Sequence, residues 1–136
     1  MLESTFGMIK PDATQRNLIG KVLARYESEG LTITHLVRKH LTLKEAEGFY
    51  EEHRGRGFFP ELVAFMSSAP VVMMVMRGEN AVSRVRELMG ATDPLEAKEG
   101  TIRKEIGLNK GENSVHGSDS PASAAREIKY FFPEYK

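Results

Sequence analysis

The spacing of apolar positions along the chain predicts alternating strands and helices. Residues 5–9 form a short β-like run, and the apolar residues of 18–26 recur at helical spacing before Gly30. Leu31, Ile33 and Val37 alternate with polar residues, which predicts a strand with one polar face. The continuous apolar run 70–76 is typical of a central strand covered on both faces.

The remaining elements follow from caps and breaks. Thr42 and Glu45 form a capping-box pattern for a short helix through Tyr50, and a second short helix is expected over 61–66. Another helical stripe covers 81–89, and a short strand near Val115 precedes a final helix that Pro133 ends. Residues 91–114 show little periodicity and are predicted to form a long, partly ordered loop, which in a compact domain is often functional.

The order of these elements predicts the fold class. The expected order is β-α-β, two short helices, then β-α-β-α, which contains two split β-α-β halves. We expect an α/β (α+β) ferredoxin-like sandwich, in which helices cover a four-stranded antiparallel sheet. The 136 residues contain no internal repeat or linker, so we expect a single domain over 1–136.

Composition excludes several function classes. Nineteen basic residues balance nineteen acidic ones, so the net charge of zero gives no electrostatic case for general nucleic-acid binding. The chain has no cysteine, which excludes disulfides, thiolate catalysis and Cys-ligated zinc. No basic leader and no apolar run of membrane-spanning length are present. We therefore expect no membrane partner and a cytoplasmic location.

One histidine stands at a predicted strand end, within the stretch 113–121. Ser120 is a good N-cap and Pro121 a good first helical residue, so the Gly, Ser and Asp residues after His116 should form a tight turn into the last helix. Such small residues would leave the imidazole uncovered. Because an unperturbed imidazole has a pKa of about 6.5, an open histidine is a candidate nucleophile or acid–base group. The alternative, a histidine that only fills a polar turn, is the commoner case.

Other residues could complete a site for a phosphorylated substrate. Glu127 lies on the helix after His116, where its carboxylate could bind one ring nitrogen and leave the other free. Lys10 follows the first strand, and Arg103 in the long loop could bind phosphate oxygens in bidentate fashion. Arg86 and Thr92 could add a cation and a hydroxyl. Each of these signals is weak alone, and for Lys10 and Arg86 a solvated surface group is the commoner case.

Two aromatic residues flank the glycine-rich break at 54–57. Tyr50 and Phe58 could stack on a nucleobase, although one of Phe58 and Phe59 is expected in the core. No glycine-rich phosphate-binding motif of the P-loop or dinucleotide type is present. His35, His40 and His53 have no metal-ligand spacing with His116, so we expect no protein-bound metal ion.

The whole pattern resembles the nucleoside diphosphate kinase family. The active-site signature of that family matches Asn113-x-x-His116-Gly117-Ser118-Asp119-Ser120. Supporting blocks occur in the family's order at 8–12, 48–50, 58–59, 68–72, 90–94, 100–103 and 123–127. The resemblance runs from about Thr5 to Phe132. A signature of eight residues with supporting blocks in register is highly specific.

The resemblance implies a function and a set of roles. The reaction would be ping-pong exchange of a γ-phosphate between ATP or other nucleoside triphosphates and nucleoside diphosphates. His116 would become phosphorylated, Glu127 would orient it, Ser118 would support both, and Tyr50 would flank the ring. The remaining residues would bind the nucleotide. Lys10 and Asn113 would contact the ribose, with Lys10 also near the transferred phosphate. Arg86, Thr92 and Arg103 would hold the phosphates, and Phe58 and Leu62 would sandwich the base.

The resemblance also implies Mg²⁺ that arrives with the nucleotide and a homo-oligomer, a tetramer or hexamer built from dimers. The chain departs from the usual family pattern at Gly57, Lys104 and Lys110, which bear on the base-binding loop, the phosphates and base preference. An alternative function is a catalytically silent nucleotide sensor. A structural or nucleic-acid-associated protein is a further alternative, which the balanced charge disfavours.

Overall fold

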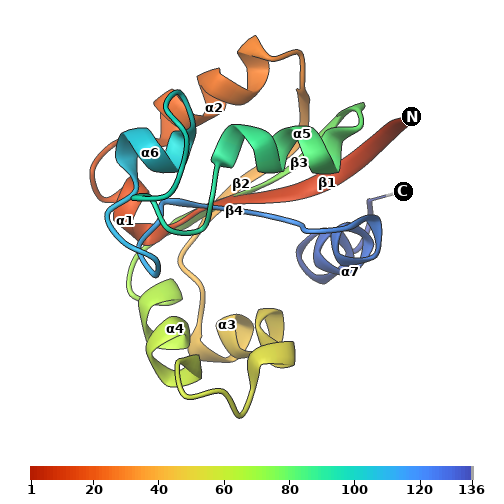
Figure 1. The fold of residues 1–136 in the computed structure, drawn as a ribbon. Helices are drawn as coiled ribbons and strands as arrows, with labels where there is room; N and C mark the ends of the chain where they lie inside the picture. The colour runs from red at the N-terminus through yellow and green to blue at the C-terminus, as the bar shows by residue number, and fades with distance from the viewer. Residues whose placement is uncertain (136) are drawn as a thin grey trace.

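A four-stranded antiparallel sheet forms the centre of the molecule (Figure 1). The computed structural model describes residues 1–135, and in it the strands lie in the order β2-β3-β1-β4. Their bounds are β1 (Leu2–Ile9), β2 (Thr32–Lys39), β3 (Val71–Glu79) and β4 (Val115–Gly117). The predicted ferredoxin-like α+β architecture is confirmed.

The apolar run predicted to be a central strand is central. β3 pairs with both β1 and β2, and its residues Val71 to Met76 are buried. Val71, Met73 and Val75 join one hydrophobic cluster, whereas Val72, Met74 and Met76 join the other. Because successive side chains of a strand point to opposite faces, a strand with two covered faces needs an unbroken apolar run.

Helices cover both faces of this sheet. The helices α2 (Ile19–Ser28), α5 (Ala81–Met89) and α6 (Ile102–Ile106) pack on one face, and their buried side chains share a cluster with Ile9 and Val72. The helices α3 (Leu43–Phe49), α4 (Phe59–Met66) and α7 (Pro121–Phe131) pack on the other face, as Figure 1 shows. The β-α-β crossovers therefore run through α2 and α5.

The predicted caps form as expected. The Thr42 side chain accepts a hydrogen bond from Glu45 N, and the Glu45 carboxylate accepts one from Thr42 N, which completes the capping box. Ser120 Oγ accepts from Ser123 N at 3.0 Å, and Pro121 is the first residue of α7. Each cap satisfies a backbone donor that the helix leaves unpaired.

One prediction from periodicity was wrong, and two short elements were not predicted. The segment 91–114 contains α6, whose Ile102 and Ile106 are buried at i, i+4 spacing, with Thr101 as its N-cap. Five helical residues are too short a stretch to establish a period. The chain also forms a one-turn helix α1 (Pro11–Thr14) and a 3₁₀ turn at Glu51–His53, neither of which was predicted.

The edge strand β2 is less covered than its alternation predicted. Of its residues only Ile33 and His35 are half-buried, and Val37 is exposed. The pairing with β3 shifts register between Ile33 and His35, which turns the later residues off the predicted phase.

Candidate active site

His116 lies in the middle of β4, opposite Met8 of β1. Its side chain is 22% exposed. The ring centroids of Phe49, Phe6 and Tyr50 lie 5.3, 6.2 and 6.5 Å from that of the imidazole, and all three rings meet it edge-on. The imidazole therefore packs against three aromatic rings and stays partly exposed to solvent. Phe6 and Phe49 were missed by sequence reasoning, although their apolar phases on β1 and α3 direct both toward this face.

Glu127 of α7 holds the imidazole from behind. Its Oε1 atom lies 2.9 Å from His116 Nε2 and also accepts a hydrogen bond from Ser118 Oγ at 2.7 Å. The carboxylate is only 4% exposed. A carboxylate accepts but does not donate, so it selects the tautomer with the proton on Nε2, which leaves the lone pair of Nδ1 free. The structure thus brings together three residues of the predicted catalytic set.

The hydroxyl of Tyr50 is a second buried group beside the histidine. It has no hydrogen-bond partner among residues 1–135. Burial, with a smaller effect from the Glu127 carboxylate, raises the pKa of Tyr50 above its usual value. Tyr50 therefore stays protonated and keeps a donor available.

Lys10 and Asn113 form a buried pair at the end of β1. Lys10 Nζ donates to Asn113 Oδ1 at 2.8 Å, and Asn113 Nδ2 donates to the backbone carbonyl of Thr92 at 3.0 Å. Lys10 is only 8% exposed, unlike the solvated lysine considered above. Burial, followed by the Arg103 charge, lowers its pKa to about 8.

The two arginines are placed differently. Arg103 lies in α6 and is buried; its Nη1 donates to the Gly90 carbonyl and its Nη2 to the Val115 carbonyl. These bonds occupy two of its five N–H groups, and Nε has no partner among the residues that the structure describes. Burial, with the nearby Arg86, lowers the pKa of Arg103. Arg86 is exposed on the last turn of α5.

A cleft of about 660 Å³ lies beside Lys10. Four of the predicted nucleotide-binding residues line it: Lys10, Phe58, Leu62 and Thr92. Phe58 is 48% exposed, whereas Phe59 is buried in the core, which confirms the expectation that one of the two is a core residue. The other lining residues are Glu61, Phe65, Asn109, Lys110, Gly111 and Glu112. Lys110, one of the departures from the family pattern, therefore faces the same cleft. The other two departures lie elsewhere: Gly57 in an exposed turn and the half-buried Lys104 on α6.

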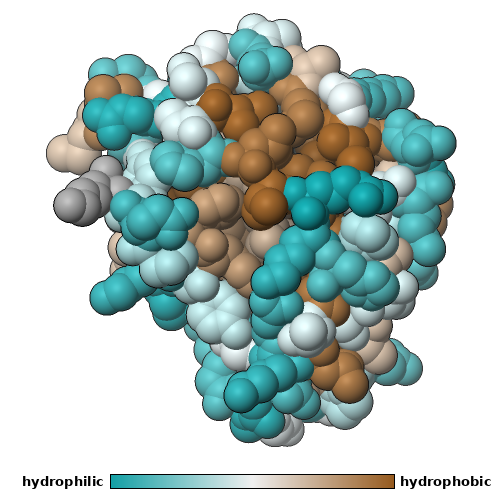
Figure 2. All heavy atoms as spheres, turned by 180° about the vertical axis from the view of Figure 1, so that it is seen from behind, coloured by the Kyte–Doolittle hydropathy of each residue, from teal (hydrophilic) through white to brown (hydrophobic). Residues whose placement is uncertain are grey.

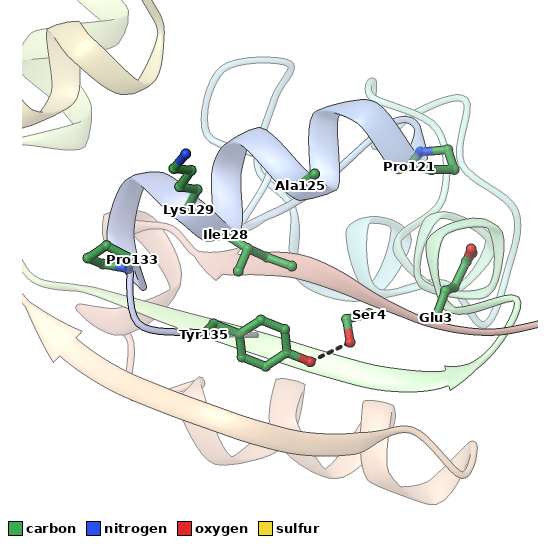
Figure 3. Close-up of a pocket in the computed structure, with 8 residues that line it drawn as sticks. All are labelled: Glu3, Ser4, Pro121, Ala125, Ile128, Lys129, Pro133 and Tyr135. Carbon is green, nitrogen blue, oxygen red and sulfur yellow. Dashed lines mark hydrogen bonds between the residues drawn. The ribbon is translucent and has the colours of Figure 1, made fainter.

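A second hollow of about 490 Å³ lies between α7 and the start of β1 (Figure 3). Ser4 and Tyr135 form a hydrogen bond at its floor, and Pro121, Ala125, Ile128 and Pro133 give it mainly apolar walls. None of the predicted site residues lines this hollow.

Residues 1–135 contain no group of three or more His, Asp or Glu side chains that could hold a metal ion. Nor does this part of the chain contain a helix with the length and apolar character needed to cross a membrane.

Comparison with known proteins gives one consistent result. The family model described as nucleoside diphosphate kinase matches residues 3–136. The chain is similar to the nucleoside diphosphate kinase of Sorangium cellulosum, with 58% identity over 135 residues that cover 99% of this chain and 94% of the relative. It is also similar to the enzyme of the same name from Actinobacillus pleuropneumoniae, at 58% identity over 97% of this chain and 96% of the relative.

The chain belongs to the nucleoside diphosphate kinase family.

Solved structures of the family share the fold. A nucleoside diphosphate kinase from Aquifex aeolicus superposes with a TM-score of 0.94 at 46% identity, covering 97% of this chain and 96% of that one. A halophilic nucleoside diphosphate kinase from Halobacterium salinarum, solved in complex with CDP, gives 0.94 at 42% identity, covering 97% and 88%. Members of this family are phosphotransferases that act on nucleotides, and the chain is one of them. The alternative of a catalytically silent sensor has no support.

Proposed function

We propose that this phosphotransferase moves the γ-phosphate of a nucleoside triphosphate to a nucleoside diphosphate through a phosphohistidine at His116. The observation that carries the proposal is the contact between His116 Nε2 and Glu127 Oε1 at 2.9 Å, on a partly open imidazole. It holds one nitrogen and leaves the other, Nδ1, as the nucleophile.

In the first half-reaction the Nδ1 lone pair attacks the γ-phosphorus. The bond from that phosphorus to the β,γ-bridging oxygen breaks, and the nucleoside diphosphate leaves with the electron pair. The imidazole then carries a phosphoryl group on Nδ1 and a proton on Nε2, and its positive charge is held by the Glu127 carboxylate. The second half-reaction reverses these steps onto another nucleoside diphosphate. No general base is needed, since Nδ1 attacks through its lone pair.

The surrounding cations suit the charge of the transferred group. Phosphoryl transfer depends on in-line positioning and on neutralising charge on the phosphate oxygens. We assign this neutralisation to Lys10, Arg86 and Arg103, with Thr92 and Asn113 as further donors to the phosphates and ribose. Among residues 1–135, Nη1 and Nη2 of Arg103 each use one N–H for a backbone carbonyl, and we assign their remaining N–H groups to such contacts.

The cleft beside Lys10 accommodates the nucleoside. The exposed ring of Phe58, with Leu62 next to it on α4, offers a flat apolar surface for a nucleobase. Stacking does not depend on which base is present, so we propose broad nucleotide tolerance. A relative of the same fold was solved in complex with CDP, which is consistent with a nucleoside diphosphate as a ligand of this chain.

Mg²⁺ enters as part of the Mg²⁺–nucleotide substrate in this proposal. The described residues offer no cluster of carboxylates or imidazoles that could form a metal cage. Mg²⁺ commonly binds through substrate phosphates and waters rather than through an all-protein site.

We also propose a homo-oligomer built from dimers. β2 is an edge strand with unpaired backbone groups, and its Leu36 and Val37 are exposed. The face turned away in Figure 1 carries a broad apolar area (Figure 2). Analytical ultracentrifugation at micromolar concentration tests this proposal, because a monomeric mass would contradict it.

The phosphoenzyme itself is the decisive test of the mechanism. Incubation with γ-labelled ATP and Mg²⁺ but no acceptor should give one acid-labile, alkali-stable label per chain, and a chase with GDP should yield labelled GTP. After alkaline digestion the label should be the Nδ1 isomer of phosphohistidine, since Glu127 occupies Nε2.

Two variants test whether the label is on His116. His116→Ala should lose the label while its circular dichroism spectrum is unchanged. His40→Ala is the matched control, because His40 is exposed and its Nε2 forms a hydrogen bond with the Ser67 carbonyl rather than with a residue of the site, so this variant should keep the label. Label that survives in His116→Ala, or that sits on Nε2, would overturn the assignment.

A further inference from the structure

A buried carboxylate outside the predicted site joins two of its segments. Asp12 lies in α1, two residues after Lys10, and is 5% exposed. Its Oδ2 accepts hydrogen bonds from Ser114 Oγ at 2.8 Å and from Arg16 Nη2 at 3.2 Å. Its Oδ1 has no partner within residues 1–135. A buried charge of this kind is costly, so a specific role is expected for it.

The partner of Asp12 lies within the signature segment. Ser114 is fully buried between Asn113 and Val115, two residues before His116, and its φ of 76° lies in the left-handed region. Residues with a Cβ rarely adopt this conformation unless surrounding contacts impose it. Here the Ser114 hydroxyl binds Asp12, and its carbonyl accepts a hydrogen bond from Lys10 N at 2.8 Å.

The two segments are thereby joined at three points. Lys10 N binds the Ser114 carbonyl, Lys10 Nζ binds Asn113 Oδ1, and Asp12 binds the Ser114 hydroxyl. Arg16 braces the junction, because its Nη2 also contacts Ser114 Oγ and the Ile106 carbonyl at the end of α6. The position of the Lys10 ammonium relative to His116 therefore depends on this junction.

We propose that Asp12, acting through Ser114, is a positioning residue for phosphoryl transfer: it fixes the Lys10–Asn113 pair relative to His116 and keeps the Lys10 ammonium charged. The inference rests on the proposed role of Lys10 at the transferred phosphate. It adds an electrostatic task to residues that otherwise serve only to join two backbone segments.

The charges around Lys10 support this task. Burial and the Arg103 charge lower the pKa of Lys10 to about 8, and Asp12 opposes both. Arg16 pairs with Asp12 and so reduces the effect of its charge on Lys10. The other charged groups that line the same cleft are Glu61, Lys110 and Glu112. Without Asp12, the ammonium would lose a proton near neutral pH, and a neutral amine cannot offset phosphate charge.

The test is the pH dependence of enzyme phosphorylation by Mg²⁺–ATP, measured as kcat/KM of the first half-reaction. This quantity reports the ionisation of the free enzyme. The wild-type rate should fall above a pKa near 8, that of Lys10. In Asp12→Asn, which keeps an acceptor for Ser114 but loses the charge, this pKa should fall by roughly half a unit or more.

Two further variants separate electrostatics from structure. Arg16→Gln removes the cation that offsets Asp12, so the same pKa should rise. Ser114→Ala loses the hydroxyl but keeps the Asp12 charge, so kcat should fall while the pKa stays in place. A merely structural role for Asp12 would not produce shifts of opposite sign. Glu99→Gln, which neutralises an exposed carboxylate, is the control and should match wild type.

The outcomes are distinguishable. An alkaline pKa that Asp12→Asn and Arg16→Gln leave unchanged overturns the inference, as does a shift of both in the same direction. If Lys10→Met retains full activity and the same alkaline limb, then the proposed role of Lys10 fails instead. Should Asp12→Asn fold poorly, titration of the Lys10 Nζ resonance in Arg16→Gln by NMR supplies the sign, since an unchanged or lowered pKa there contradicts the proposal.

Discussion

Replacing Glu127 isolates the contribution of one carboxylate to the nucleophile. Glu127→Gln keeps an oxygen that can accept from both His116 Nε2 and Ser118 Oγ, but it removes the negative charge. Hydrogen bonds to charged groups contribute about 1.5–3 kcal/mol, against about 0.5–1.5 kcal/mol for neutral ones. The midpoints of these two ranges differ by roughly 1.2 kcal/mol, and this loss affects the step that makes the imidazole positive. We therefore expect phosphorylation to slow about eightfold.

Glu127→Ala removes the acceptor as well. The full charged hydrogen bond is lost, so the rate should fall by roughly 10- to 150-fold. Two donors, on His116 and Ser118, are left without their partner at a buried position. Each such donor costs about 1–3 kcal/mol of folding stability. This variant should therefore also unfold at a lower temperature than Glu127→Gln.

The assay is single-turnover phosphorylation by γ-labelled ATP and Mg²⁺ in a rapid-quench instrument, with thermal unfolding followed in parallel. The order of rates should be wild type, Glu127→Gln, then Glu127→Ala. Glu99→Gln, an exposed carboxylate change, should behave as wild type. If both Glu127 variants phosphorylate as fast as wild type, the carboxylate does not orient or stabilise the imidazole and the reasoning is refuted.

Three further predictions follow from separate features. Phe58→Ala should raise the KM for GDP and CDP alike by roughly 5- to 150-fold in steady-state assays, because base stacking contributes about 1–3 kcal/mol. The value of kcat should change little. A change in KM for only one of the two nucleotides would contradict stacking. Gly90→Ala should lower the free energy of unfolding in urea by about 3 kcal/mol. Gly90 has φ 88° and ψ −178°, and an added Cβ would lie 2.6 Å from Thr101 Oγ1. Gly57→Ala is the control, because an added Cβ there has no atom within 4 Å. Lys10→Met should stabilise the fold at pH 7 by at most about 3 kcal/mol, because the pKa of Lys10 in the folded protein, about 8, lies below the usual 10.5. The unfolded chain binds more protons between these two pH values, so wild-type stability rises with pH and the difference between variant and wild type closes by pH 10.5. Urea titrations that find the same difference at every pH would refute this.

The sequence was sufficient for the order of elements and the fold class. The apolar run of β3, the capping box at Thr42 and the Ser120-Pro121 helix start are local signals, and each has one dominant structural outcome. The position of His116 before a turn of small residues is local in the same way. Its resemblance to a family signature supplied roles that periodicity could not.

The limits of sequence reasoning appear at Lys10 and Arg103. Both were expected to be available cations, yet both are buried, and the Arg103 guanidinium already binds the carbonyls of Gly90 and Val115. The short helix α6 was predicted as loop. Burial of a polar side chain depends on which distant segments cover it, and no local pattern records that.

Sequence alone thus determined which residue types are present and which local elements they form, because capping, periodicity and chain breaks act within a few residues. Only the tertiary structure decided that Glu127 meets Nε2 rather than Nδ1, that Asn113 binds the Lys10 ammonium, and that Asp12 lies against Ser114. The last two contacts join residues that lie 103 and 102 positions apart in the sequence. Their partners are set by sheet pairing and by the packing of both faces, and the same burial that fixes their geometry also lowers the pKa of Lys10.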